Sequence, residues 1–290
     1  MIHHIQHGNY SAAISELGAE LKSFKNENTN TEYIWYGLSE FWTGSAPLLF
    51  PNVGKLKNDE YVLNNKTYQM KQHGFARKSF FELVDKTESM AKFILRSNQE
   101  TLKIYPFKFE LYVSFEISDA KLKITNTVRN TGIQDLIFTI GTHPAFNLSL
   151  KNLSLEDYYI EFDKHENNLQ LSELKEGLLK NKTKAFSLSK NNRIGLSSDT
   201  FNNDALIFKN INSRSISIGS TKSDFKLTLR NTSDAPHLGI WSIPGAPYVC
   251  IEPWHGHADM IDSDKDFTKK DGAITLDKGK IFISGYEILV

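Results

Sequence analysis

Three short segments of the chain place histidines, an arginine and a carboxylate beside aromatic rings. They are residues 72–77, 141–147 and 251–256, and each lies at or near the end of an apolar, strand-like run. An imidazole titrates near neutral pH, and burial can raise the pKa of a carboxyl group toward the same range. Such a set can transfer protons without a metal or cofactor, so we expect no cofactor. Aromatic rings beside it suit a flat, polar molecule such as a sugar.

His143 and Glu252 are the first candidates for the proton-transfer groups. His143 follows the strand-like run 136–140 and stands between a glycine and a proline, which places its imidazole in a loop where a strand ends. Loops at sheet edges often carry functional residues, although a lone histidine there is more often structural. Glu252 follows the apolar run 248–251. A partly buried carboxyl group there would have a raised pKa and act as a base, whereas the alternative is a glutamate paired with a cation.

His73 and Arg77 form a second candidate pair. If their segment is extended, residues four apart share a face, and both side chains could reach one ligand. The alternative is a surface loop with an ordinary solvated arginine.

The sequence gives weak grounds for a metal site. His255 and His257 would point the same way on a strand, where Glu252 or Asp259 could join them as ligands. The glycine between them and the polar residues that follow indicate a loop, and a third ligand is not secure, so we expect no metal. The single cysteine, Cys250, lies in an apolar run, which predicts a buried core thiol.

Strand patterns dominate the elements that would position these side chains. The clearest alternating runs are residues 80–84, 92–96, 107–115, 121–125 and 226–230. A period of two places one face of a strand on a core and the other in water. Residues 171–177 fit a short helix or a hairpin, and we find no long helical period and no phosphate-binding glycine motif. These features predict an all-β fold of stacked antiparallel sheets.

The bulk composition narrows the possible partners. The chain has 290 residues, which suits a single domain spanning residues 1–290, and its 34 basic and 34 acidic residues balance. That balance gives no electrostatic reason to expect nucleic acid or an anionic membrane as partner. The single cysteine and the lack of a signal peptide or a long apolar stretch favour a cytoplasmic location. The polar segment 152–203 reads as a solvated excursion of the same domain.

Taken together, the motifs resemble the aldose 1-epimerase (galactose mutarotase) family, and most closely its LacX-like branch. The resemblance rests on residues 73–77, 141–147 and 251–254, which occur in family order and span nearly the whole chain. It implies a large antiparallel β-supersandwich, in agreement with the strand patterns, and a small-molecule sugar substrate.

The resemblance also implies roles for individual residues. Glu252 would take the proton from the C1 hydroxyl while His143 protonates the ring oxygen, so that the sugar ring opens, rotates about C1–C2 and recloses as the other anomer. His73 would hydrogen-bond near the ring oxygen, Arg77 would bind hydroxyls or orient the base, and Asp204 would hold sugar hydroxyls.

Lys55 departs from the family pattern, because members often carry arginine in that segment and lysine cannot repeat its planar contact. We therefore expect Lys55 to influence sugar preference. Trp42, Phe146 and Trp254 are candidates for stacking on a sugar, with core packing as the equal alternative.

Two alternative functions remain open on this evidence. One is epimerisation of hexose 6-phosphates, with Lys55 and Arg77 contributing to a phosphate pocket. The other is non-catalytic sugar binding, against which the presence of both an acid and a base argues. The oligomeric state is left open.

Overall fold

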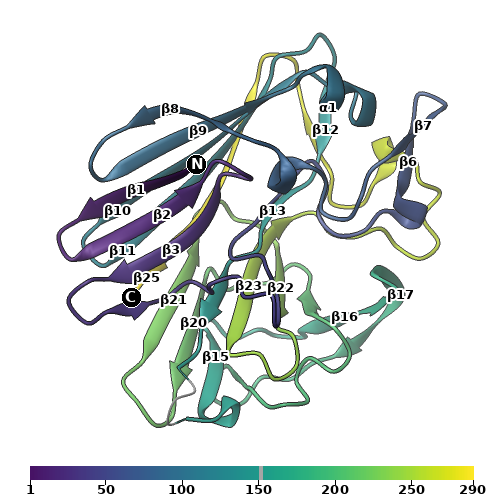
Figure 1. Cartoon of the computed structure of the whole chain (residues 1–290). Helices are drawn as coiled ribbons and strands as arrows, with labels where there is room; N and C mark the ends of the chain where they lie inside the picture. The colour runs from purple at the N-terminus through teal and green to yellow at the C-terminus, as the bar shows by residue number, and fades with distance from the viewer. Residues whose placement is uncertain (150–152) are drawn as a thin grey trace.

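Two large antiparallel sheets contain most of the strands in the computed structural model, which describes residues 1–149 and 153–290 (Figure 1). The larger sheet has nine strands in the order β18 (Arg193–Gly195), β15 (Tyr158–Phe162), β20 (Ser215–Ser220), β21 (Lys226–Asn231), β25 (Ile281–Leu289), β11 (Lys121–Asn130), β10 (Phe109–Ser118), β9 (Met90–Arg96) and β8 (Glu82–Lys86).

The second sheet carries the functional segments. Its order is β17 (Leu178–Ala185), β16 (Gln170–Lys175), β19 (Leu206–Phe208), β22 (His237–Trp241), β23 (Tyr248–His255), β13 (Ile140–Thr142) and β5 (Leu48–Leu49), with β14 (Ala145–Asn147) also paired to β23. Strands far apart in sequence therefore meet at β23, which places the segments around residues 143 and 252 side by side.

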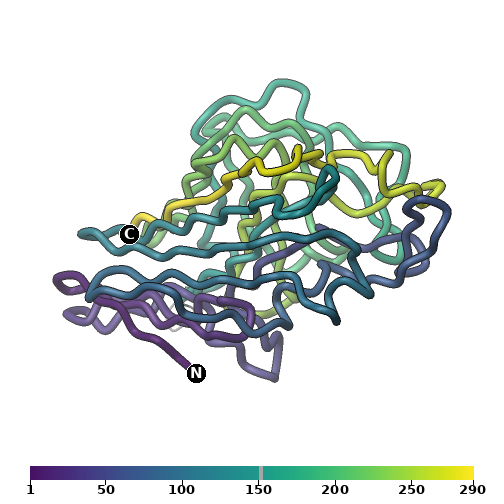
Figure 2. Tube along the Cα trace, turned by 90° about the horizontal axis from the view of Figure 1, so that it is seen from above, coloured from purple at the N-terminus to yellow at the C-terminus, as the bar shows by residue number. Residues whose placement is uncertain are grey.

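Smaller elements complete the architecture. A four-stranded N-terminal sheet consists of β1 (Ile2–His7), β2 (Tyr10–Ser15), β3 (Glu20–Asn26) and β4 (Thr31–Glu32), and it packs against β9 and β10 (Figure 2). Two-stranded pairs join β6 (Glu60–Leu63) to β7 (Lys66–Gln69) and β12 (Leu136–Phe138) to β24 (Ile274–Leu276). The helical elements described are α1 (Gln99–Ile104) and four 3-10 turns, η1 (Lys57–Asp59), η2 (Ala76–Lys78), η3 (Leu155–Asp157) and η4 (Phe267–Lys269). Within the described ranges, no helix has both the length and the hydropathy to cross a membrane.

The alternating sequence pattern is realised directly in β10. Its odd-numbered residues from Phe109 to Ile117 are buried, and the residues between them are half-buried or exposed. Because successive side chains of a strand point to opposite faces, this alternation seats one face of β10 on the core. The predicted all-β class with antiparallel sheets is confirmed, and residues 171–177 form the hairpin end of β16 and β17 rather than a helix.

Two expectations about local structure were wrong. The run 136–140 does not form one strand, because it is divided between β12 and β13, which belong to different sheets. The segment 152–203 is not simply a solvated excursion, because β15 to β18 add strands to both large sheets. Residue 152 itself lies outside the described residues. Its many lysines and asparagines occupy the outward positions of edge strands such as β17, whose second half is exposed.

Candidate active site

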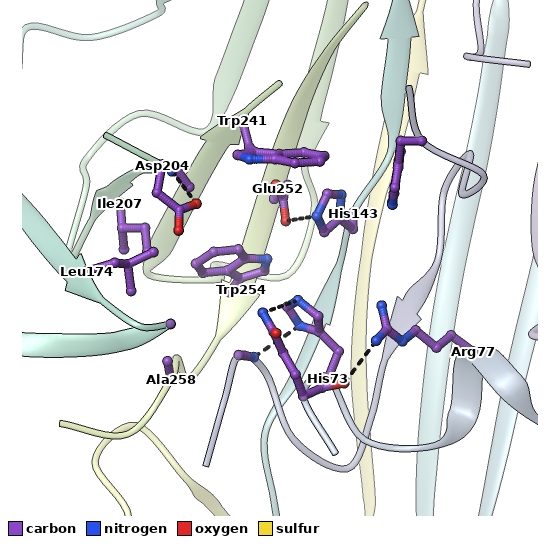
Figure 3. A pocket seen from close by; sticks show the side chains of 15 residues that line it. His73, Arg77, His143, Leu174, Asp204, Ile207, Trp241, Glu252, Trp254 and Ala258 are labelled. Atoms are coloured by element: carbon purple, nitrogen blue, oxygen red, sulfur yellow. Dashed lines mark hydrogen bonds and ion pairs between the residues drawn. The ribbon is translucent and has the colours of Figure 1, made fainter. Parts of the chain in front are cut away.

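A cavity of about 250 Å³ opens beside β22 and β23 (Figure 3). Its polar and aromatic lining residues come from separate segments of the chain and include Trp42, His73, Arg77, His143, Asp204, Trp241, Glu252 and Trp254. Pockets for drug-sized ligands typically measure roughly 300–1,000 Å³, so this one suits a smaller molecule.

Strand β23 contributes two residues, Glu252 and Trp254, to the lining of the cavity. Glu252 and Trp254 are alternate residues of this strand and share one face, while Cys250 lies further along the same face. Two glycines on the neighbouring strands make room for the indole of Trp254, because a Cβ on Gly141 or Gly239 would lie 2.5 Å from that ring. Trp254 can therefore lie flat across both neighbours and form one wall of the cavity.

His143 and Glu252 form a close pair in the cavity wall. The Nε2 atom of His143 lies 3.3 Å from Oε2 of Glu252, and both residues are buried. His143 occupies the break between β13 and β14, as predicted for a residue where a strand ends. Glu252 lies within β23 rather than after its end, so its burial is nearly complete, at 1% exposure.

Burial shifts both groups toward their neutral forms. It lowers the pKa of His143 to about 3. It raises the pKa of Glu252 well above the usual range; the nearby indole N–H of Trp254 opposes this in part, and the Asp204 carboxylate adds to it. That N–H lies outside good hydrogen-bond geometry and has no partner among the described residues. Both shifts favour a protonated carboxyl group beside an uncharged imidazole.

The backbone conformation of His73 and contacts at both of its ring nitrogens fix this side chain, with Nε2 lying 3.3 Å from the Gln72 side-chain amide. Its φ is +68°, in the left-handed region, and its Nδ1 accepts a hydrogen bond of 3.1 Å from the Gly54 N–H. The neutral ring consequently carries its proton on Nε2. Although the ring is partly exposed to the cavity, burial lowers its pKa well below the usual value, with the charges of His143 and Arg77 acting in the same direction. His73 is therefore a neutral hydrogen-bond donor.

Arg77 reaches the cavity by a different route from the one predicted. The segment is not extended, because His73 is left-handed and Arg77 lies in the 3-10 turn η2. One Nη of Arg77 donates to the Gln72 carbonyl at 3.0 Å, and its Nε is buried without a partner among the described atoms. The guanidinium thus retains unused donors beside the cavity.

Asp204 lies across the cavity from Arg77 (Figure 3). Its φ is +77°, and its Oδ1 accepts a 2.7 Å hydrogen bond from the Ala205 N–H, which holds the carboxylate in place. The cavity therefore has a cationic side and an anionic side, with the His143–Glu252 pair between them.

Other predicted residues divide between the cavity and the core. Trp42 and Trp254 line the cavity, whereas Phe146 is fully buried, which favours core packing. Lys55 is not part of the lining, because its Nζ donates to the Glu176 carbonyl at 3.0 Å. Trp241 was missed; the run 237–241 gave no polar motif that would have marked it.

The histidines considered as metal ligands do not converge. The ring of His255 lies 3.2 Å from the Ser233 hydroxyl, whereas Nε2 of His257 lies 3.1 Å from the Asp271 carboxylate. Within the described residues, a different trio is close enough to hold an ion, namely His143, Cys250 and Glu252. Cys250 is a buried thiol, as predicted from its apolar run.

Comparison with known proteins gives consistent matches along the chain. The family described as Aldose 1-epimerase matches residues 1–284. The plasmid-encoded protein LacX of Lactococcus lactis subsp. lactis is 32% identical over 255 residues, which cover 85% of each chain.

Solved structures share the fold over its whole length. A galactose mutarotase related enzyme from Lactobacillus acidophilus superposes with a TM-score of 0.93 at 37% identity, covering 100% of this chain and 97% of that one. A galactose mutarotase-like protein from Lactobacillus casei ATCC 334 also gives 0.93, at 33% identity and with 100% and 99% coverage.

Proposed function

Because the chain belongs to the aldose 1-epimerase family, we propose that it interconverts the α and β anomers of a free hexose by opening and reclosing the sugar ring. The observation that carries the proposal is the buried pair of His143 Nε2 and Glu252 Oε2, 3.3 Å apart at the cavity wall. The two oxygens that exchange protons in this reaction, the C1 hydroxyl and the ring oxygen, are bonded to the same carbon. A base and an acid acting on them must therefore lie close together.

Ring opening moves one proton from the sugar to Glu252 and another from His143 to the sugar. Once the Glu252 proton has passed to His143 Nε2, 3.3 Å away, Glu252 as carboxylate accepts the C1 hydroxyl proton and His143 as imidazolium donates to the ring oxygen, so that the C1–ring oxygen bond breaks and an aldehyde forms. After rotation about C1–C2, the two residues exchange roles and the ring closes on the other face. The pair holds one proton before and after each step, so no proton need enter from solvent.

Neighbouring groups would hold the sugar against this pair. The Nε2–H of His73, which contacts the Gln72 side-chain amide at 3.3 Å, would donate near the ring oxygen once that amide gives way. The free donors of Arg77 and the carboxylate of Asp204 would bind hydroxyls on opposite sides. Trp241 and Trp254 lie on either side of the Glu252 carboxylate and offer apolar surfaces to the C–H faces of a sugar (Figure 3).

A free sugar fits the charges of the cavity better than a hexose 6-phosphate. Arg77 is the one cationic side chain among the lining residues described, and Asp204 faces it. Lys180 and Lys184 line an adjoining groove, but both pair with Glu173. Indifference of the rate to inorganic phosphate would support a free sugar; competitive inhibition by phosphate would favour the phosphorylated one.

Polarimetry of freshly dissolved α-D-glucose and α-D-galactose tests the proposal. Wild-type protein is expected to accelerate mutarotation, and Glu252→Gln and His143→Ala should each reduce that acceleration by about a hundred- to ten-thousand-fold, the usual contribution of positioned proton transfer. Both variants should keep the wild-type circular dichroism spectrum.

Two outcomes would contradict the assignment. Wild-type turnover in either variant would remove the proposed acid and base. Binding of galactose by the wild-type protein without any acceleration would indicate a sugar-binding protein that is not an enzyme.

A further inference from the structure

We propose that His143, Cys250 and Glu252 form a binding site for a thiophilic divalent cation such as Zn²⁺, and that its occupation blocks the proton-transfer pair. One ligand atom from each residue lies within 4.8 Å of the other two, and all three residues are buried. A histidine, a cysteine and a carboxylate are a ligand set that zinc accepts, whereas Mg²⁺ prefers oxygen ligands.

The distances in the trio are close to those of a tetrahedral site. With metal–ligand bonds of about 2.0–2.3 Å, neighbouring ligand atoms in a tetrahedron are about 3.3–3.5 Å apart. The His143–Glu252 separation of 3.3 Å already meets this value. The Cys250 sulfur, within 4.8 Å, must approach by about an ångström, which a change of side-chain torsion can supply.

Unused bonding capacity at the site also points to a ligand. Oε2 of Glu252 is buried and, apart from its 3.3 Å contact with His143 Nε2, has no hydrogen-bond partner among the described residues. Buried polar atoms normally have a partner, so this oxygen is free to bind a cation. Cys250 is likewise wholly buried and forms no disulfide.

The charge balance favours a doubly charged ion. A thiolate and a carboxylate together neutralise one Zn²⁺, and the imidazole binds as a neutral ligand, so the occupied site carries no net charge. Binding releases the protons of the Cys250 thiol and of the Glu252 carboxyl to solvent.

The cavity gives the metal ion access to the site and leaves room for a water molecule as fourth ligand. His143 and Glu252 line the cavity, whereas Cys250, two residues before Glu252 on β23, does not. Three protein ligands leave one tetrahedral position, which a water molecule can fill from the cavity. Because the ion uses the same nitrogen and carboxylate that exchange protons with the sugar, it would act as an inhibitor and not as a cofactor.

Cobalt spectroscopy tests binding without relying on catalysis. Co²⁺ added to the wild-type protein should give the near-ultraviolet charge-transfer band of a cobalt–thiolate bond and visible bands of tetrahedral geometry. Cys250→Ala and Cys250→Ser should both lose the thiolate band, with melting temperatures confirming that they fold. Absence of the band in folded wild-type protein would overturn the site, whatever the result of the sugar assay.

Inhibition provides the second measurement, and it rests on the proposed function. Zn²⁺ should inhibit mutarotation reversibly, with activity restored by EDTA, and Mg²⁺ should not inhibit. Cys250→Ala should raise the half-inhibiting Zn²⁺ concentration by about 100-fold or more, since loss of even an outer-shell partner costs roughly 10- to 100-fold in metal affinity.

A control separates this site from surface histidines near the N-terminus. His4→Ala/His7→Ala should remain as sensitive to Zn²⁺ as the wild type, because both residues are exposed. Equal inhibition of the wild type and of Cys250→Ala, or loss of inhibition in the histidine variant, would contradict the proposal.

Discussion

At the residue scale, the main feature is a buried carboxyl group next to a buried imidazole, with the uncharged form of each favoured by its surroundings. Burial shifts the pKa of Glu252 upward and that of His143 downward, so each shift reduces the charge that the interior must hold. These shifts disfavour the carboxylate–imidazolium form of the pair, and they make the stability of the folded protein sensitive to the ionisation of Glu252.

We predict that Glu252→Gln changes the pH dependence of stability as well as activity. The ordinary pKa of this carboxyl group is 4.5 and burial raises it in the folded protein, so between these values the native state binds more protons than the unfolded state. The wild type should therefore lose up to about 1.4 kcal/mol per pH unit relative to the variant as the pH rises through this window. Urea denaturation between about pH 4.5 and 8 would measure it.

The matched control is Glu116→Gln, at an exposed position of β10. Its stability curve should run parallel to that of the wild type. If the Glu252→Gln curve is also parallel, Glu252 does not hold its proton in the folded state.

The sequence motifs supply most of the polar side chains that line the cavity. His73, Arg77, His143, Asp204 and Glu252 all line one cavity, although they are distant along the chain. Lys55 was expected there because of its place in a motif, but its side chain points to a neighbouring carbonyl. The direction in which a side chain points depends on how the strands pair, and a local sequence pattern does not contain that information. The same holds for the presence of Trp241 in the cavity wall.

At the element scale, the close approach of the backbone at residues 73 and 74 to Phe50 sets the position of His73. Gly74 has φ +67°, and a Cβ there would collide with the Phe50 carbonyl oxygen, while the next residue's N–H donates to that oxygen at 3.0 Å. His73 is consequently carried to the cavity by a close backbone approach that only glycine permits next to it.

We predict that Gly74→Ala destabilises the protein more than Gly279→Ala. Gly279 has φ +74°, but a Cβ added there would meet nothing within 4 Å, so alanine suffers only the conformational strain of about 1 kcal/mol. At Gly74 the collision should add about 1–3 kcal/mol and reduce activity by displacing His73. Thermal melts and polarimetry measure both effects, and equal losses in the two variants would contradict this explanation.

A buried ion pair fixes another part of the cavity wall. Lys270 Nζ lies 2.7 Å from Asp259 Oδ1, with side-chain exposures of 3% and 5%, and it also donates to the His257 carbonyl. The other oxygen of Asp259 accepts the Lys57 N–H at 3.0 Å. Together these bonds hold the segment that contains Ala258, a lining residue.

Lys270→Met should therefore cost about 3–5 kcal/mol, because it leaves Asp259 charged and buried without its cation. Lys269→Met is the neighbouring control: that lysine is 70% exposed, so its pairs with Asp264 and Asp266 should contribute little to stability. Urea midpoints would compare them, and a loss at position 270 no larger than at 269 would exclude the proposed anchoring.

Sequence patterns predicted strands best where one face of the strand is exposed to solvent and the other is buried. The runs near β9, β10, β11 and β21 were recognised because alternation survives there, but β12 and β13 were merged because both are short and apolar. Within 152–203, the edge strand β17 was missed because its lysines make it look like a loop, whereas β15 was missed although it has no lysine and lies inside the larger sheet.

At the scale of the whole molecule, several buried histidines make the folded state less stable at acidic pH. Burial lowers the pKa of His237 and of His255 to about 4, and that of His143 to about 3. In the unfolded chain they titrate near about 6.5, so below that pH the unfolded state binds more protons and the native state loses stability.

We expect the free energy of unfolding to fall already between about pH 6.5 and 4.5. His237→Asn should lessen this fall by up to about 1.4 kcal/mol per pH unit, the effect of one proton. His4→Asn, at an exposed position, should leave it unchanged. Denaturation midpoints across this range measure the slope, and an unchanged slope in His237→Asn would show that the residue is protonated in the folded state.

The central place of β25 has a consequence for how the protein is made. This strand follows all the others along the chain, yet it lies between β21 and β11 in the nine-stranded sheet. Until the ribosome has synthesised residues 281–289, the edges of β21 and β11 have no partner strand. Unpaired strand edges are prone to pair with other chains. Closure of the larger sheet therefore comes late, and chaperones that shield nascent strands should matter more for the yield of this protein than for its final stability.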